Sequence, residues 1–191
     1  MITSPRNTRR AILDLAEAFI QEKGFNGFSY AHIAAELGVK NAAIHYHFPS
    51  KEELGCAIIQ RYRDRFQLWT NNARVSNLPP KEKLDWFFSI YSDMRADHGK
   101  ICLAGSLETE FNAIPAALRE QTESLARELL SWLEAVLEEG RQAGDFRFGG
   151  KAADKAALIL ASLQGALQMA RALGNRKFQA VVQQHRQDLL A

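Results

Sequence analysis

Apolar residues recur at helical spacing along nearly all of this 191-residue chain, and this periodicity constrains the fold more than any other feature. One stripe near the N-terminus consists of Ile12, Leu15, Ala16, Phe19 and Ile20. Positions three and four apart share one face of an α-helix, so the stripe predicts an amphipathic helix. No segment shows a convincing two-residue alternation of the kind that a half-buried β-strand requires. The sequence therefore predicts an all-α fold.

Capping and helix-breaking residues divide the pattern into about nine helices, of which three short ones lie near the N-terminus. Gly24 ends the first, and Ser50 with Glu53 three residues later forms a capping box at the start of the fourth. The expected helices extend up to residue 24 and then over about 30–37, 40–46, 50–72, 81–97, 101–112, 115–144, 151–173 and 175–189.

Three residues have the spacing that a helix-turn-helix requires. Ala34 is small enough for close helix approach, and Gly38 can adopt the left-handed backbone of the turn. Ile44, six residues further on, can anchor the second helix against the first. A plain helical hairpin would also satisfy this spacing. We expect the helix-turn-helix over about residues 28–47, a DNA-binding domain at 1–64 and a second helical domain at 65–191.

Residues 33–54 resemble the signature of the TetR family of bacterial regulators. The residues that carry the resemblance are Tyr46, His47, Phe48, Lys51 and Leu54, preceded by Phe28, Ser29 and Tyr30. The similarity is strong over about residues 5–65, and beyond them only length and helix number agree. It implies a three-helix DNA-binding domain followed by a helical bundle that binds an effector and dimerises. Residues 41–43 and 45 differ from the commoner Lys-Gly-Thr and Tyr, so no base preference is carried over.

The leading end of the second helix in the helix-turn-helix is the expected reader of DNA sequence, because it meets base edges in the major groove. Lys40 suits guanine and Asn41 suits adenine. Ala42 and Ala43 allow close backbone approach or contact with a thymine methyl. His45 faces either the DNA or solvent. The resemblance implies phosphate contacts from Ser29, Tyr30, Tyr46, His47 and Lys51.

Charge is distributed unevenly, although the net charge is only +2. Residues 1–65 carry nine basic and seven acidic side chains, whereas residues 66–191 carry fifteen of each. So small a bias is also typical of an ordinary solvated surface. It argues against an architectural DNA-binding protein, which would be basic throughout.

Aromatic and soft side chains in the middle helices exceed what a bundle of this size needs. Each one singly is explained as core, but the resemblance implies a ligand cavity among the fourth to eighth helices, with an apolar lining and few polar groups. The candidates for this effector pocket are Phe66, Trp69, Trp86, Phe87, Tyr91, Met94, Cys102, Glu108, Phe111, Gln164 and Gln168.

The helix expected at 151–173 is apolar nearly all round, which predicts burial on two sides. Ala161, Gly165 and Ala172 are small enough for a second helix to approach closely. We therefore expect a homodimer formed through residues 151–190. A two-fold dimer presents two recognition helices to successive major grooves, about 34 Å apart.

Together these features predict a ligand-responsive transcriptional regulator, a repressor that binds palindromic operator DNA as a dimer and is released by a small-molecule effector. Activation is an alternative, because promoter position decides the outcome. A second alternative is a thiol-based electrophile or redox sensor acting through Cys102, near Lys100, whose charge would favour the thiolate. A free cysteine is also typical of a small buried hydrophobe.

We expect no metal, no cofactor and no enzymatic activity. His45 and His47 lie two positions apart on a helix, so their rings point about 200° from each other and cannot share an ion. The N-terminus has no apolar segment typical of a signal peptide, and no apolar run approaches the ~20 residues that cross a bilayer. With Cys56 and Cys102 as free thiols, a cytoplasmic protein without a membrane segment is expected.

Overall fold

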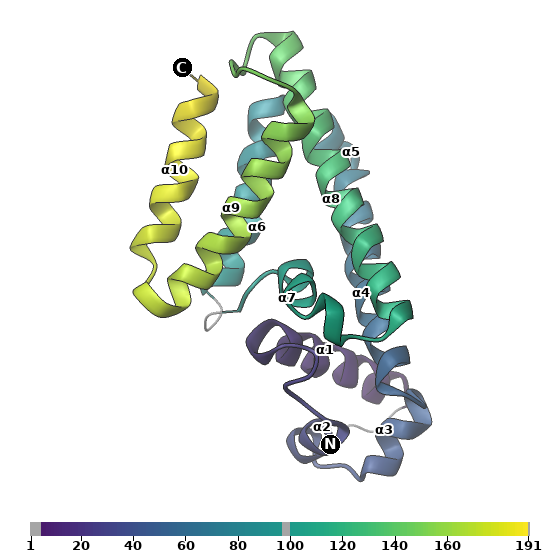
Figure 1. The fold of residues 1–191 in the computed structure, drawn as a ribbon. Helices are drawn as coiled ribbons and strands as arrows, with labels where there is room; N and C mark the ends of the chain where they lie inside the picture. The colour runs from purple at the N-terminus through teal and green to yellow at the C-terminus, as the bar shows by residue number, and fades with distance from the viewer. Residues whose placement is uncertain (1–4, 97–99, 191) are drawn as a thin grey trace. The chain divides into compact units, whose positions relative to one another are not determined.

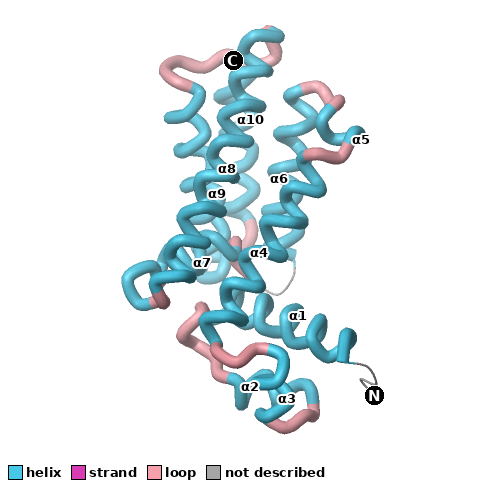
Figure 2. Tube along the Cα trace, turned by 90° about the vertical axis from the view of Figure 1, so that its right-hand side faces the viewer, coloured by secondary structure: helices cyan, strands magenta, loops and turns pink. Residues whose placement is uncertain are grey.

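The computed structural model describes residues 5–96 and 100–190, and all regular structure in these residues is helical (Figure 2). Ten α-helices and one short 3₁₀ helix follow one another in the described part of the chain, which confirms the all-α prediction. The helix absent from the prediction is Ala73–Ser76, because four residues are too few to show a helical stripe.

The helices in chain order, as labelled in Figure 1, are α1 Pro5–Lys23, α2 Tyr30–Leu37, α3 Asn41–His47, α4 Lys51–Thr70, α5 Ala73–Ser76, α6 Pro80–Ala96, α7 Leu103–Thr109, the 3₁₀ helix η1 Phe111–Ala113, α8 Ala116–Ala143, α9 Ala152–Leu173 and α10 Arg176–Leu190. Two of the expected boundary signals are visible in the backbone. Gly24 ends α1 with a φ of 83°, and the N–H of Glu53 donates to Ser50 Oγ at 3.1 Å in the first turn of α4.

The chain divides into two compact units. The first, called unit 1 below, comprises Met1–Phe66 and Leu103–Leu125. The second, unit 2, comprises Gln67–Cys102 and Ala126–Ala191. Helices α4 and α8 each contribute residues to both units.

In unit 1, α1 packs against α2 and against α7 (Figure 1). The hydroxyl of Ser106 on α7 donates to the carbonyl of Ile20 on α1 at 2.6 Å. After α7, the Glu110 carboxylate accepts the backbone N–H of Asn26 at 3.2 Å. These contacts attach a segment more than 80 residues away in sequence to the end of α1 and the loop that follows it.

In unit 2, α9 lies beside α10 and also packs against α6 (Figure 1). Gly140 allows the loop after α8 to fold back, because a Cβ there would stand 2.1 Å from the Phe146 ring. The N–H of Arg147 in the same loop donates to the carbonyl of Leu189 at 2.8 Å. By length and composition α9 could cross a membrane, contrary to the expectation from the sequence, but a core helix of a soluble protein has the same properties.

Candidate functional site

The turn between α2 and α3 has the geometry that the spacing of Ala34, Gly38 and Ile44 predicted. Gly38 has φ 63° and ψ 33°, the left-handed conformation that glycine adopts without a Cβ penalty. The N–H of Val39 donates to the carbonyl of Ala34 at 3.0 Å and closes the turn. Ile44 is completely buried and Ala34 nearly so, so the inner side of α3 is anchored to the domain. The helix-turn-helix is thereby confirmed as part of the fold.

The anchored α3 exposes its leading end. Lys40 is the N-cap residue and is exposed, as are Asn41 and Ala42, whereas Ala43 is half-buried. In a helix-turn-helix the leading end of the second helix meets base edges, so these exposed residues stay the predicted base-contacting set.

The later residues of α3 differ in their surroundings. Tyr46 is 79% exposed, and its ring contacts the ring of half-buried His47 at 5.1 Å between centroids. His45 is exposed, packs edge-on against Tyr30 at 4.7 Å, and has Nδ1 3.3 Å from the carbonyl of Pro49. Because a carbonyl only accepts, this nitrogen is the protonated one when the bond forms.

Tyr30 makes its contacts inside unit 1. Its side chain is buried and its hydroxyl donates to the carbonyl of Phe48 at 2.9 Å. Burial, with a smaller contribution from the charge of Glu53, raises the pKa of Tyr30 to about 12. The hydroxyl therefore keeps its proton at neutral pH and ties the start of α2 to the residue that follows α3.

Lys51 and Ser29 complete the predicted DNA-binding set. The Lys51 ammonium donates to the carbonyl of Phe28 at 2.5 Å and lies over the rings of Phe25 and Phe28 at 4.6 and 4.4 Å. Burial lowers the pKa of Lys51, and the charge of Glu110 partly offsets this effect. Ser29 is exposed at the N-cap of α2, and its N–H donates to Nδ1 of His32 at 3.1 Å.

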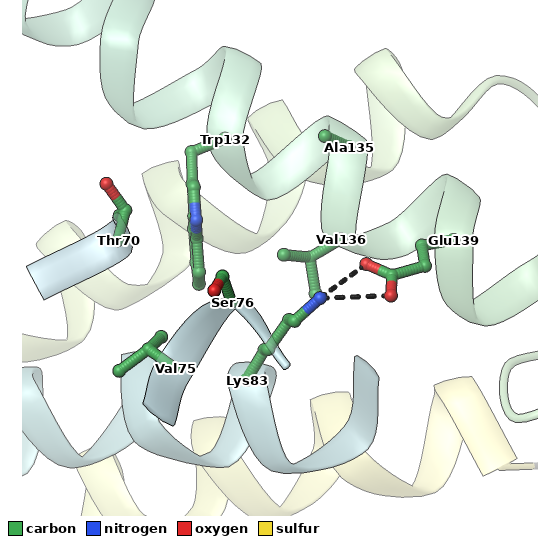
Figure 3. A pocket seen from close by; sticks show the side chains of 8 residues that line it. All are labelled: Thr70, Val75, Ser76, Lys83, Trp132, Ala135, Val136 and Glu139. Atoms are coloured by element: carbon green, nitrogen blue, oxygen red, sulfur yellow. Dashed lines mark hydrogen bonds and ion pairs between the residues drawn. The ribbon is translucent and has the colours of Figure 1, made fainter. Parts of the chain in front are cut away.

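Unit 2 contains a cavity of about 210 Å³ (Figure 3). Its polar centre is the Lys83 ammonium, which donates to both carboxylate oxygens of Glu139 at 2.9 and 2.7 Å. Trp132 forms one wall, and its ring contacts the rings of Trp69 at 5.0 Å and Phe87 at 5.4 Å. The lining consists of Thr70, Val75, Ser76, Lys83, Trp132, Ala135, Val136 and Glu139.

None of the eleven residues predicted for an effector pocket lines this cavity, but some lie behind its wall. Trp69 and Phe87 support Trp132, Phe87 contacts Tyr91 at 5.3 Å, and the Tyr91 hydroxyl lies 3.7 Å from Cys102 Sγ. The others are dispersed: Phe66, Glu108 and Phe111 in unit 1, and half-exposed Trp86, half-buried Met94, half-buried Gln164 and exposed Gln168 on helices of unit 2.

Sequence reasoning missed the cavity's polar pair, since Lys83 and Glu139 are 56 positions apart and no local pattern connects them. Trp132 lies at helical spacing from Leu129 and Val136 on α8, but nothing in the sequence marks its ring as a pocket wall. Cys102 is only 1% exposed, so a reagent would reach its thiol only if the surrounding helices opened. Among the described residues, no three His, Cys, Asp or Glu side chains form a group that could hold a metal ion.

Comparison with known proteins matches two parts of the chain to family models. Residues 12–57 match the family model described as bacterial regulatory proteins, tetR family, and residues 80–185 match the one described as tetracyclin repressor-like, C-terminal domain. An uncharacterized HTH-type transcriptional regulator of Lactococcus lactis is 30% identical over 131 residues, 65% of each chain. The HTH-type transcriptional repressor DhaR of Mycobacterium sp. is 22% identical over 170 residues, 88% of this chain and 85% of DhaR.

Solved structures share the fold over the whole chain. The crystal structure of a TetR-family transcriptional regulator from Agrobacterium tumefaciens has a TM-score of 0.90 and 31% identity, and the match covers 98% of this chain and 100% of the other. The two family matches together include both the helix-turn-helix and most of the C-terminal helices. This chain therefore belongs to the TetR family of bacterial transcriptional regulators.

Proposed function

We propose that the protein is a repressor that binds a palindromic operator as a homodimer and leaves the DNA when a small-molecule effector binds its C-terminal helices. The observation that carries this proposal is the exposed leading end of α3 on a firmly anchored helix-turn-helix. Because the family consists of regulators rather than enzymes, we assign the site to binding. A cytoplasmic location and a functional boundary near residue 64 form part of the same proposal.

The DNA contacts follow from exposure and from the available hydrogen-bond donors. Lys40 and Asn41 reach base edges, with Ala42 and Ala43 allowing the close approach. Phosphates bind Ser29, Tyr46 and His47, and His45 lies at the margin of the interface. The exposure of Lys40, Asn41 and Tyr46 supports these assignments.

Lys51 and Tyr30 differ in the number of hydrogen-bond donors that they can offer to a phosphate. An ammonium has three N–H donors, so Lys51 can keep the carbonyl of Phe28 and still offer a donor to a phosphate. The hydroxyl of Tyr30 has one proton, which the carbonyl of Phe48 already accepts. We assign Tyr30 to positioning α3 rather than to direct phosphate contact.

The exposed side of α9 supports dimerisation through residues 151–190. Leu158 is 57% exposed and Met169 is 43% exposed on that side. Ala161 lies between them. Apart from the adjoining residues and backbone of α9 itself, no described atom comes within 4 Å of the place where a Cβ would stand at Gly165. An apolar strip with a small-residue centre suits the close approach of the same strip from a second subunit.

Effector release requires that the ligand favour one spacing of the dimer's two DNA-binding domains over another. A ligand with equal affinity for both spacings would not shift the equilibrium between them. The α4 helix contributes to both units and begins at Lys51. We therefore propose that α4 transmits the effect of ligand binding to the DNA-binding domain.

The test is selection of an operator from a random duplex library, followed by footprinting of the purified protein. The proposal predicts protection of one palindrome with two half-sites about one helical turn, ~34 Å, apart. Uniform coating of the duplex, or protection of a single half-site at saturation, would contradict it.

A further inference from the structure

We propose that the cavity lined by α4, α5, α6 and α8 in unit 2 binds a small organic monocarboxylate. The ligand carboxylate replaces Glu139 as the partner of Lys83, and its apolar body lies against Trp132. The carboxylate would be the effector of the proposed function. Only the expected loss of operator affinity on binding rests on that function. Binding itself is measured separately.

The two charges of the cavity differ in their freedom to move. Lys83 is only 8% exposed, and its ammonium is held by both oxygens of Glu139. A buried ammonium needs an anionic partner, because an unpaired charge is expensive to bury. The side chain of Glu139 is 49% exposed, so its carboxylate can turn into water at little cost. The positive charge is thus fixed and the negative charge is exchangeable.

This asymmetry determines which sign of charge the ligand should carry. A cationic ligand would have to take Glu139 away from Lys83 and leave the buried ammonium without a counter-charge. An anionic ligand exchanges one carboxylate for another and keeps Lys83 paired through a charge-assisted hydrogen bond. A neutral molecule offers no such exchange, so a carboxylate is favoured over both.

The rest of the lining indicates the size and the apolar character of the remainder of the ligand. Figure 3 shows Trp132 on one side of Val136 and the Lys83–Glu139 pair on the other. Val75 and Val136 are buried, and the rings behind Trp132 hold its indole in place. A cavity of about 210 Å³ lies below the ~300 Å³ at which ordinary drug-sized pockets begin. An acid the size of benzoate or hexanoate fits this description.

The experiment titrates the full-length protein with benzoate and with hexanoate, using tryptophan fluorescence and calorimetry. Benzamide and benzyltrimethylammonium serve as the neutral and cationic counterparts of benzoate. We expect saturable binding of at least one of the two carboxylates and none of the amide or the ammonium ion at equal concentration.

Two variants give opposite results if the inference is correct. Glu139→Gln removes the resident competitor, so the Kd for the carboxylate should fall about 3- to 10-fold as the competent fraction of the site rises. Lys83→Met removes the fixed charge and should raise the Kd at least roughly tenfold. Glu138→Gln changes a neighbouring acid that pairs with Arg141 outside the cavity, and it should leave the Kd unchanged.

The inference is overturned if Glu139→Gln weakens binding, if benzamide binds as well as benzoate, or if neither carboxylate saturates at millimolar concentration. Glu139→Gln keeps the test decisive even if Lys83→Met does not fold. Operator affinity is measured on the same preparations. A protein that binds its operator but no carboxylate refutes this inference alone, whereas carboxylate binding without change in operator affinity supports the cavity and contradicts effector release.

Discussion

The outward sides of α3 and α9 are both exposed, yet their chemistry is opposite. α3 presents hydrogen-bonding side chains, including the exposed Asn41, His45 and Tyr46. α9 carries no charged residue between Lys155 and Arg171 and exposes Leu158 and Met169. A polar face is stable in water until a hydrogen-bonding partner replaces the water, whereas an apolar face gains by being covered. The difference suits one unit to meet nucleic acid and the other to meet a second copy of itself.

The two units also bury their polar groups differently. In unit 1, nearly buried Glu17 lies between two guanidinium groups, accepting from Arg61 at 2.5 Å and also from Arg65. In unit 2, His185 is 6% exposed, and Nε2 contacts the Ser162 hydroxyl while Nδ1 has no hydrogen-bond partner among the described residues. Unit 1 therefore keeps Glu17 charged by pairing it, as unit 2 does with Lys83, but unit 2 also buries His185 as a neutral side chain.

The largest expected effect comes from placing a charge on the apolar strip of α9. Ala161→Glu would bury an unpaired carboxylate in the proposed dimer interface, which costs about 3–5 kcal/mol and weakens dimerisation more than roughly 100-fold. Because Ala161 is exposed in the single chain, the monomer should still fold. Sedimentation equilibrium measures the dimer constant, and operator affinity should fall in parallel.

Ala153→Glu is the matched control, since it makes the same change on an exposed position of α9 outside the strip. It should leave the dimer constant within a few-fold of the original. Equal effects of the two substitutions would show that the apolar strip of α9 is not the dimer interface, and the contrast with the polar side of α3 would lose its meaning.

The next effect concerns base recognition by α3. Asn41→Ala should cost about 1–3 kcal/mol of operator binding and relax the preference at one base pair of each half-site. Competition assays with single-base operator variants measure this loss. Asn175→Ala, at an exposed position in the linker after α9, should change neither affinity nor preference. A uniform loss on every duplex would assign Asn41 to the phosphates instead.

Local sequence patterns were sufficient for the parts of the structure that depend on neighbours along the chain. The small residue, glycine and branched residue at positions 34, 38 and 44 predicted the turn, and Gly38 adopts the left-handed backbone that this role requires. Helical stripes likewise predicted nine of the ten helices, because periodicity reports which face of a helix is buried.

Periodicity does not report what the buried face meets, and this is why the cavity was missed. Trp132 stands at helical spacing from other apolar residues of α8, but its contact with Trp69 connects positions 63 apart. Lys83 likewise has its partner on α8, 56 positions away, and no local pattern connects the two. The same reason explains why the Phe48 carbonyl could not be read from the sequence as the partner of the Tyr30 hydroxyl.

A smaller effect sharpens the account of Tyr30. Tyr30→Phe removes a buried hydrogen bond and leaves the Phe48 carbonyl without this donor, so the free energy of unfolding should fall by about 1 kcal/mol. Urea unfolding measures that loss. The slope of operator affinity against salt concentration should not change, because no phosphate contact is removed. A slope reduced by about one would instead show that the hydroxyl binds a phosphate.

The smallest effect tests whether unit 2 does bury a neutral histidine. Burial, with a smaller contribution from the charge of Lys155, lowers the pKa of His185 from 6.5, and Asp188 opposes the shift. Above pH 7 the ring is neutral in both folded and unfolded chains, so it adds no pH dependence. As the pH falls through 6.5, the unfolded chain binds a proton that the folded chain does not, and the free energy of unfolding must decrease.

Urea unfolding at pH 7.5 and 5.5 should therefore show a drop in stability that is smaller in His185→Gln than in the original protein. An identical drop in His185→Gln would mean that other groups cause the acid sensitivity. The Ser162–His185 contact would then give no reason to expect α9 and α10 to separate in acid.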